Sequence, residues 1–242
     1  MRSPIITPFV LVLCSMAICA CNSAPGRPAA DSEELRPNQV SNFDTLYQQN
    51  CAGCHGEQGR GGAAIALNSP VYLAIADNAT IRRITAQGVP GTAMPAFAQS
   101  SGGMLTDEQI GAIVDGIRSS WGKNDSLDVP PPTYTAHAPG NPQHGTSVYD
   151  TYCSSCHGAA GRGGSRAGSI VDDSFLSLSS DQYLRTIVIV GRPELGAPDW
   201  RGNVPGQPMS QQDVSDVVAW LSAQRQKQAL SSSTKSPAGG IQ

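Results

Sequence analysis

The sequence has few aromatic residues, few charged residues and no excess of positive charge. Aromatic residues make up 5% and charged residues 14% of the 242 residues, and the formal net charge is −3. Nucleic-acid-binding domains present a basic face, so this balance argues against nucleic acid as a partner. A hydrophobic content of 39% is typical of a globular protein. With so few aromatic side chains, each half of the chain has a thin core unless something large fills it.

The chain also lacks a long apolar run. Its most apolar stretch, residues 5–20, follows Arg2 and is too short and too lightly flanked for a membrane span, so it predicts an export signal. Ile18-Cys19-Ala20-Cys21 resembles a bacterial lipobox. This resemblance implies that residues 1–20 are a signal peptide removed before Cys21, which then carries lipid and anchors the protein to a membrane. An uncleaved anchor and a soluble protein with chance cysteines are the alternatives.

No cysteine is left over for a disulfide bond. Of the seven cysteines, Cys14, Cys19 and Cys21 belong to the N-terminal segment. The other four occur in two C-x-x-C-H motifs, Cys51-Ala52-Gly53-Cys54-His55 and Cys153-Ser154-Ser155-Cys156-His157. In this motif two thiols on one helical turn can add to the vinyl groups of a haem, and the adjacent imidazole binds the iron. The sequence therefore predicts two covalently bound haem c groups.

Two other readings of the C-x-x-C pairs fit less well. Two such pairs could form a structural four-thiolate zinc site. Both pairs, however, are followed at once by histidine, and both lie inside longer matching segments, which favours haem. A thioredoxin-like redox pair would follow a strand, and no β-rich run precedes either pair.

The chain contains an internal repeat. Cys51 and Cys153 lie 102 positions apart, and the similarity extends well beyond the motifs. The matched segments are Leu46-Tyr47 with Val148-Tyr149; Gly56, Gly59, Arg60, Gly61 and Gly62 with Gly158, Gly161, Arg162, Gly163 and Gly164; and, after one inserted residue, Ile81-Arg82 with Leu184-Arg185. The two halves are therefore expected to share one fold.

Each repeat has the pattern of a small all-α unit. Apolar residues between Val40 and Asn50 follow a helical period that ends at the first motif, and glycine turns come after it. The last helix of the first repeat is predicted to start at Thr106, with Asp107 and Glu108 in its first turn, and that of the second repeat is predicted to start at Ser210. Its inward positions are Ile110, Ile113, Val114 and Ile117 in the first repeat, and Val214, Val217, Val218 and Leu221 in the second.

With these motifs, residues 40–228 resemble class I cytochrome c domains in tandem, as in di-haem electron carriers and the haem subunits of terminal oxidases. The resemblance implies an all-α fold in which a few helices wrap round each covalent haem. It also implies that the iron has a histidine and a methionine as ligands, with the methionine in a loop before the last helix. In the first repeat Met94, followed by proline, fits this role better than Met104, which adjoins the predicted helix start at Thr106. A thioether ligand raises the reduction potential.

The second repeat departs from the pattern. Alignment of the loops without a gap puts Ala197 at the position of Met94, and an alanine methyl cannot bind iron. Met209 is the only methionine after His157, but alignment of the helix starts puts it over Leu105, where an apolar residue ordinarily packs. Three readings stay open: Met209 is the iron ligand, the iron has an open position, or another group such as a linker histidine binds it. We keep Met209 as the candidate metal ligand beside His55, Met94 and His157.

The remaining segments complete the layout. We expect a flexible tether at 21–39, cytochrome c domains at 40–121 and 144–228, a proline-rich, semi-rigid linker at 122–143 and a disordered tail at 229–242. His137 and His144 are expected to be solvated. Arg60 and Arg162 follow the two motifs at the same offset, where each could pair with a haem propionate or simply lie at the surface.

The sequence therefore predicts a non-enzymatic electron carrier. It would be exported and lipid-anchored on the periplasmic side of a bacterial membrane, as part of a respiratory chain. Its redox partners would be a quinol-oxidising complex or dehydrogenase and a terminal oxidase or reaction centre, with no small-molecule substrate. The alternative is a haem enzyme, a peroxidase or a sulfur-compound dehydrogenase, that uses an open coordination position on the second haem. Against it, no His, Glu or Cys cluster surrounds the second motif.

Overall fold

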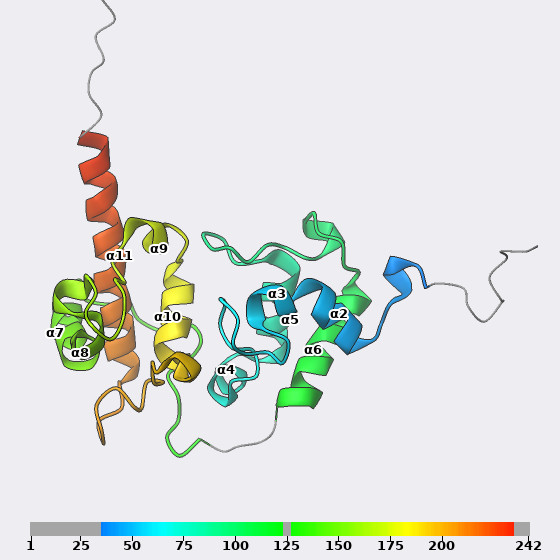
Figure 1. Cartoon of the computed structure of the whole chain (residues 1–242), viewed down its shortest axis with the longest axis horizontal. Coiled ribbons are helices and arrows are strands. Elements are labelled where there is room, and N and C mark those ends of the chain that lie inside the picture. Colours follow the sequence, from blue (N-terminus) through cyan, green and yellow to red (C-terminus); the bar gives the residue numbers. More distant parts are fainter. Residues whose placement is uncertain (1–34, 123–126, 235–242) are drawn as a thin grey trace, which may run out of the picture. The chain divides into compact units, whose positions relative to one another are not determined.

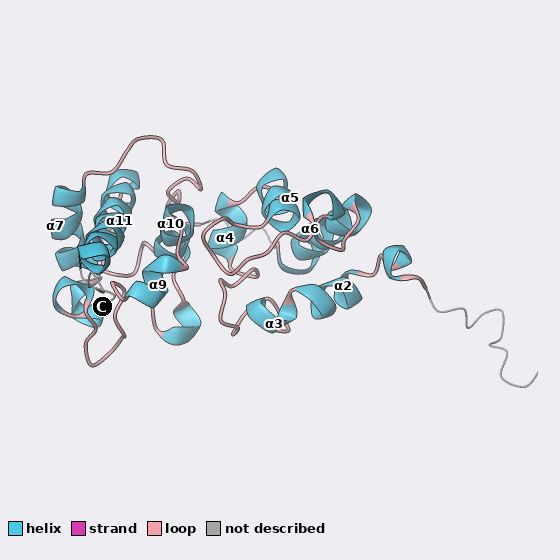
Figure 2. Cartoon of the chain, turned by 90° about the horizontal axis from the view of Figure 1, so that it is seen from above, coloured by secondary structure: helices cyan, strands magenta, loops and turns pink. Residues whose placement is uncertain are grey.

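The computed structural model describes residues 35–122 and 127–234, with side chains placed through Arg225. Every regular element in these ranges is a helix, and loops join them (Figures 1 and 2). The all-α prediction is confirmed. None of the helices in the described ranges is long and apolar enough to cross a membrane. The predicted signal peptide, Cys21, most of the predicted tether and residues 235–242 lie outside the described residues.

Residues 40–122 and 127–234 belong to one compact unit, and a separate unit ends at Gln39. In the smaller unit the structure describes only residues 35–39, which include the 3-10 helix η2 (Pro37–Gln39). Both predicted haem domains therefore belong to the same compact unit.

The first repeat contains five α-helices and a short 3-10 helix. They are α2 (Phe43–Asn50), α3 (Ala52–His55), α4 (Pro70–Ile75), α5 (Asn78–Gln87), η3 (Gln99–Ser101) and α6 (Asp107–Trp121). Polar side chains fix the helix starts: Asn42 caps α2, Asp77 caps α5, and Thr106 forms a capping box with Gln109 at α6. The predicted start of the last helix at Thr106 is confirmed.

The second repeat reproduces the order of the five α-helices, but its 3-10 helices lie elsewhere. It contains α7 (Pro142–Tyr152), α8 (Ser154–His157), η4 (Ala159–Gly161), α9 (Asp173–Ser177), α10 (Asp181–Val190), η5 (Pro193–Leu195) and α11 (Gln211–Thr234). Ser210 caps α11 as predicted: its hydroxyl accepts a hydrogen bond from the Asp213 amide, while the Asp213 carboxylate accepts one from the Ser210 amide.

In each repeat the first helix packs on the last one. α2 lies against α6 and α7 lies against α11 (Figure 1). The apolar positions predicted to face inward are all buried in both last helices. Burying an aliphatic side chain stabilises the fold by about 1.5–3 kcal/mol, so these two sets of side chains contribute much of the stability of each helix pair.

The linker and the last helix differ from the predicted layout. α7 begins at Pro142, inside the predicted linker, because proline is well tolerated at the first helical position and Asn141 caps the helix. Earlier in the linker, the carbonyl of Thr133 accepts a hydrogen bond from Arg185 of α10 (3.0 Å). α11 continues to Thr234, beyond the predicted domain end at Gln228.

Candidate functional site

The first C-x-x-C-H motif occupies a single helical turn directly after α2. The Cys51 amide donates to the Tyr47 carbonyl of α2 (2.8 Å), and the His55 amide donates to the Cys51 carbonyl (2.9 Å). These bonds make Cys51 the junction between α2 and α3. Both thiols and the imidazole therefore project from one turn, as covalent haem attachment requires.

The imidazole of His55 is held in one tautomer. Its Nδ1 lies 2.7 Å from the carbonyl oxygen of Ile65, and His55 is only 7% exposed. A carbonyl oxygen only accepts hydrogen bonds, so Nδ1 carries the proton and Nε2 keeps its lone pair for a metal. Burial lowers the pKa of His55, and the Arg192 cation lowers it further, against the opposing effect of the Ile65 bond. The neutral, ligating form is thus favoured.

The second motif repeats this geometry. The amides of Cys153 and His157 donate to the carbonyls of Tyr149 (2.8 Å) and Cys153 (3.0 Å). His157 Nδ1 lies 3.0 Å from the carbonyl oxygen of Gly168. His157 is half-buried, whereas His55 is buried, so the second site is the more accessible of the two.

A tyrosine in each repeat fixes the chain just after the motif. The Tyr47 hydroxyl donates to the Gly56 carbonyl (2.7 Å), and the Tyr149 hydroxyl donates to the Gly158 carbonyl (2.5 Å). Gly56 has a φ of +82°, and a Cβ there would lie 1.8 Å from the Arg60 carbonyl oxygen. Only glycine fits this close turn, which explains why the motif is followed by glycine.

All four motif cysteines are free. Burial, followed by the neighbouring Cys54 thiol, raises the pKa of Cys51 to about 11. Burial and Cys156 raise the pKa of Cys153 to about 12. No group of three or more His, Cys, Asp or Glu side chains that could hold a metal ion occurs in the part of the chain that the structure describes. The paired-thiolate zinc site is therefore not formed among these residues.

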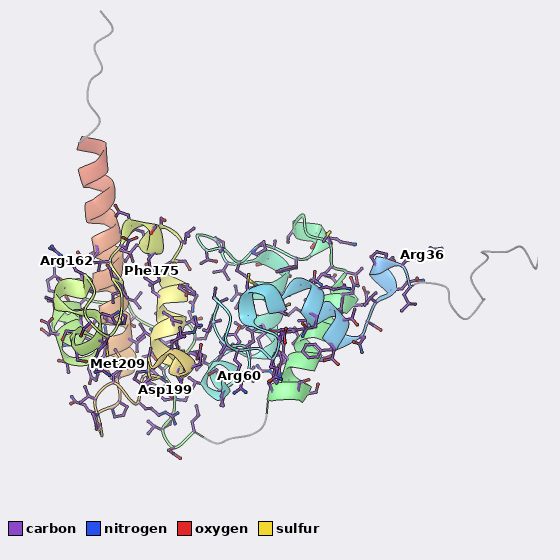
Figure 3. The ribbon with its side chains drawn as sticks, in the orientation of Figure 1. Arg36, Arg60, Arg162, Phe175, Asp199 and Met209 are labelled. Carbon is purple, nitrogen blue, oxygen red and sulfur yellow. The ribbon has the colours of Figure 1, made fainter. Side chains whose placement is uncertain are left out.

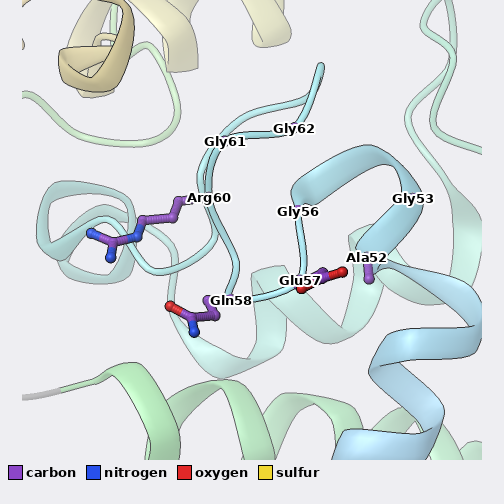
Figure 4. Close-up of a pocket in the computed structure, with 8 residues that line it drawn as sticks. All are labelled: Ala52, Gly53, Gly56, Glu57, Gln58, Arg60, Gly61 and Gly62. Carbon is purple, nitrogen blue, oxygen red and sulfur yellow. The ribbon is translucent and has the colours of Figure 1, made fainter.

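A cavity of about 460 Å³ lies beside the first motif (Figure 4). It is lined by Ala52, Gly53, Gly56, Glu57, Gln58, Arg60, Gly61 and Gly62, which are the motif turn and the glycine loop after it. The Arg60 side chain points away from this turn, and both Arg60 and Arg162 are exposed. None of the candidate iron ligands lines this cavity.

Met94 lies in the loop between α5 and α6. It is half-buried, and its amide donates to the Thr92 hydroxyl (3.2 Å). Met104, which competes with it in the sequence, is 80% exposed, because its neighbour Leu105 takes the buried position before α6. The structure thus separates the two methionines clearly, with Met94 on the partly covered loop.

In the second repeat, different residues occupy the positions of Met94 and Leu105. Ala197 lies in the loop after α10, in a bridge with Arg192. Met209 is 3% exposed and belongs to the hydrophobic core, directly before α11 (Figure 3). Of the two other histidines, His137 is exposed, and His144 is not simply solvated because its Nδ1 contacts Asp216 Oδ2 (2.6 Å).

Arg192 is a residue that the sequence pattern did not single out. It belongs to the second repeat, yet its guanidinium donates to the carbonyls of Gly62 (2.7 Å) and Ala63 (3.1 Å) in the glycine loop of the first. It also forms an ion pair with Glu194. No local motif marks such a contact, because it depends on how two distant loops meet.

The residues present fit a covalent haem at both motifs. In each repeat two free thiols and a histidine share one turn, the histidine Nδ1 bonds a carbonyl, and a glycine turn leaves no room for a Cβ beside it. This is the donor set and the local backbone that haem c attachment uses.

Comparison with known proteins agrees with this chemistry. A cytochrome c oxidase subunit of Azospirillum sp. (strain B510), "Cbb3-type cytochrome c oxidase subunit CcoP", is 32% identical over 135 residues, which are 51% of this chain and 41% of that protein. The chain thus spans about two fifths of that relative's length. The Kuenenia stuttgartiensis reducing HAO-like protein complex Kustc0457/Kustc0458 covers 79% of this chain and 97% of its own at 18% identity, but its TM-score of 0.43 is too low to bear on function.

The family described as "Cytochrome C oxidase, cbb3-type, subunit III" matches the chain twice, at residues 38–115 and 140–221. Each match contains one C-x-x-C-H motif, the helix before it and the beginning of the last helix of its repeat. The matches cover well over half of the chain, and they coincide with the two repeats found in the sequence. The chain therefore belongs to the cbb3-type cytochrome c oxidase subunit III family and is a tandem c-type cytochrome.

Proposed function

We propose that this cytochrome transfers electrons through two covalent haems, one on each C-x-x-C-H motif. When bound, each haem supplies a one-electron iron couple. The observation that most supports the proposal is the matched anchoring of His55 by Ile65 and of His157 by Gly168. In both repeats this anchoring orients the ring and leaves Nε2 free for iron.

The chain's own residues set the conditions for transfer. Burial of His55 and of the apolar residues around it keeps water from the first site. In our proposal Met94 provides the sixth ligand there, and its thioether favours ferrous iron and so raises the potential.

The partners and the location belong to this proposal as well. The Azospirillum relative is named as an oxidase subunit, so we propose a terminal oxidase as the acceptor, with a reaction centre as the other possibility. The donor would be a quinol-oxidising complex or a dehydrogenase. The cytochrome would work on the periplasmic side of a bacterial membrane, held by lipid on Cys21, either as a free carrier or as a fixed subunit.

A haem enzyme is the second candidate, and one observation favours it: Ala197 stands where the first repeat has Met94. Proton-dependent catalysis at iron needs acid–base groups nearby. Between His157 and Met209 the sequence has no His, Cys or Lys that could serve as such a group. Electron transfer therefore remains the function that the chain supports better.

An optical redox titration of the purified protein tests the proposal. We expect two one-electron transitions, each with the spectrum of a c-type haem, and no turnover of peroxide or thiosulfate. Turnover of either compound that disappears in a His157→Ala variant would favour the enzyme instead. A protein without any c-type haem spectrum would contradict both candidates.

A further inference from the structure

The second repeat keeps the ligand loop of the first but not its ligand. In the first repeat the Val89 amide donates to the Met94 carbonyl (3.1 Å). In the second, the Arg192 amide donates to the Ala197 carbonyl (2.8 Å). Both bonds close a loop of the same length, so Ala197 has the backbone position of Met94.

The glycine that precedes each loop supports the same alignment of the two loops. A Cβ on Gly88 would lie 2.7 Å from the carbonyl carbon of Pro95, and a Cβ on Gly191 would lie 2.5 Å from that of Pro198. These prolines directly follow Met94 and Ala197. The loop is therefore not shifted to bring another residue to the ligand position.

Met209 is held in a packing position. The Leu105 amide donates to the Phe97 carbonyl (2.8 Å), and the Met209 amide makes the corresponding bond to the Trp200 carbonyl (2.9 Å). Met209 is 3% exposed, and the next residue caps α11. Its sulfur lies 4.0 Å from Asn203 Nδ2. Met209 thus fills the core as Leu105 does in the first repeat.

The loops between His157 and Met209 offer no other strong ligand. The sequence between His157 and Met209 contains no His, Cys or Lys. His144, the one histidine of the linker region that the fold engages, is bound to Asp216, which also accepts hydrogen bonds from the Asn141 amide (2.7 Å) and from Gln212 (2.8 Å). Releasing it would leave Oδ2 of the buried Asp216 carboxylate without its hydrogen bond.

We propose that the haem on His157 has one open axial position, which binds a small neutral ligand of the diatomic class, such as carbon monoxide or nitric oxide. Ala197 lacks the three side-chain atoms that Met94 has beyond Cβ. The volume of these three atoms is sufficient for a diatomic molecule. This inference rests on the proposed function, because it requires haem on the second motif.

Carbon monoxide binding to the dithionite-reduced holoprotein tests the inference. Intact mass first shows whether both haems are attached, which tests the proposed function separately. With two haems present, we expect about half of the Soret absorbance to shift on addition of carbon monoxide. Two attached haems and no shift would overturn the open site while leaving the proposed electron transfer in place.

Three variants identify the site. Ala197→Met supplies the missing thioether and is expected to abolish the carbon monoxide shift. Met94→Ala copies the second repeat into the first and should double the shifted fraction. Met209→Leu, which places the residue of the first repeat at the matched core position, should leave the fraction unchanged. If Met209→Leu instead creates a shift absent from the native protein, Met209 is the ligand and the inference fails.

Discussion

The two repeats cover equivalent tyrosines with tryptophans from positions that do not correspond. Trp121, the last residue of α6, meets Tyr47 edge-on, with ring centroids 5.1 Å apart. Trp220, in the middle of α11, stacks on Tyr149 at 4.4 Å. When the helix caps are aligned, Trp220 falls on Gly116 instead of Trp121. Each repeat thus places an indole on this tyrosine, but from a different position of its last helix.

A swap of large and small residues explains the difference. In the first repeat Phe43 of α2 packs against Gly116 of α6, where any Cβ would clash with the ring. In the second, Gly145 takes the place of Phe43, and Trp220 takes the place of Gly116. Packing in a helix pair is set by the summed volume of facing residues, so one large and one small residue can exchange sides.

Each last helix also supplies an arginine to equivalent acceptors from positions that do not correspond. Arg118 of α6 donates to the carbonyls of Leu73 (2.6 Å) and Ala76. Arg225 of α11 donates to those of Leu176 (3.0 Å) and Ser179. These carbonyls correspond residue for residue and lie at the ends of α4 and α9, where helix carbonyls lack partners. The arginines do not correspond, since Ser222 aligns with Arg118.

Removing Trp220 is the largest expected perturbation. Trp220→Gly should destabilise the second repeat by about 3–5 kcal/mol, because the large side chain is 6% exposed and its neighbour is a glycine. Trp121→Gly should cost less, because Trp121 is only half-buried. Hydrogen exchange of peptides from α7 and α11, compared with those from α2 and α6, measures each repeat separately.

The volume exchange can be tested directly in the first repeat. Gly116→Trp combined with Phe43→Gly recreates the pair of the second repeat, because the three atoms nearest to a Cβ on Gly116 all belong to the Phe43 side chain. We expect the double variant to be more stable than Gly116→Trp alone. A double variant that is no more stable would show that facing volume does not explain the difference between the repeats.

Removing either arginine should have a smaller and nearly equal effect. Arg118→Ala and Arg225→Ala are each expected to cost about 2–3 kcal/mol, because each leaves two helix-end carbonyls without a charged donor. The matched test adds Ser222→Arg to Arg225→Ala, which moves the donor to the position it has in the first repeat. Recovery of hydrogen-exchange protection is expected, and its absence would mean that the acceptors are not equivalent.

Much of this architecture could be predicted from the sequence. The haem turns, the caps at Thr106 and Ser210 and the alanine at the Met94 position follow from local patterns and from self-comparison. The exchanged tryptophans and arginines could not be predicted in this way. Self-comparison pairs residues by position, whereas packing depends on which side chain reaches a given place from the facing helix.

The acid stability of the two repeats should also differ. Burial alone would raise the pKa of Asp216, but hydrogen bonds from the Asn141 amide, His144 and Gln212 outweigh it and lower that pKa. The stabilisation that the Asp216 carboxylate provides is therefore complete above its unfolded pKa near 3.9. It is lost as the pH falls through the lower pKa of the folded state. The first repeat has Ala112 at the aligned position.

Asp216→Asn tests this difference. We expect a loss of about 1.5 kcal/mol in the second repeat at neutral pH, the size of a hydrogen bond to a charged group. The loss should shrink toward pH 2 and leave the first repeat unchanged. Hydrogen exchange or urea unfolding across this pH range measures it, and a loss independent of pH would rule out the carboxylate as its source.

The smallest expected effect concerns the tyrosine–glycine hydrogen bond that both repeats share. Tyr47→Phe and Tyr149→Phe each remove one hydroxyl bond to the glycine after the motif, at a cost of about 1 kcal/mol. The two losses should be equal within error in urea titrations. A clear inequality would show that the motif turns are held differently, in spite of their matched geometry.

The account depends most on a covalent haem in each half of the chain. Its most direct test is the intact mass of protein made with a cytochrome c maturation system, together with the Cys153→Ala/Cys156→Ala variant. We predict that the native chain carries the mass of two haems and the variant the mass of one. A native chain that carries one haem or none would contradict the central claim.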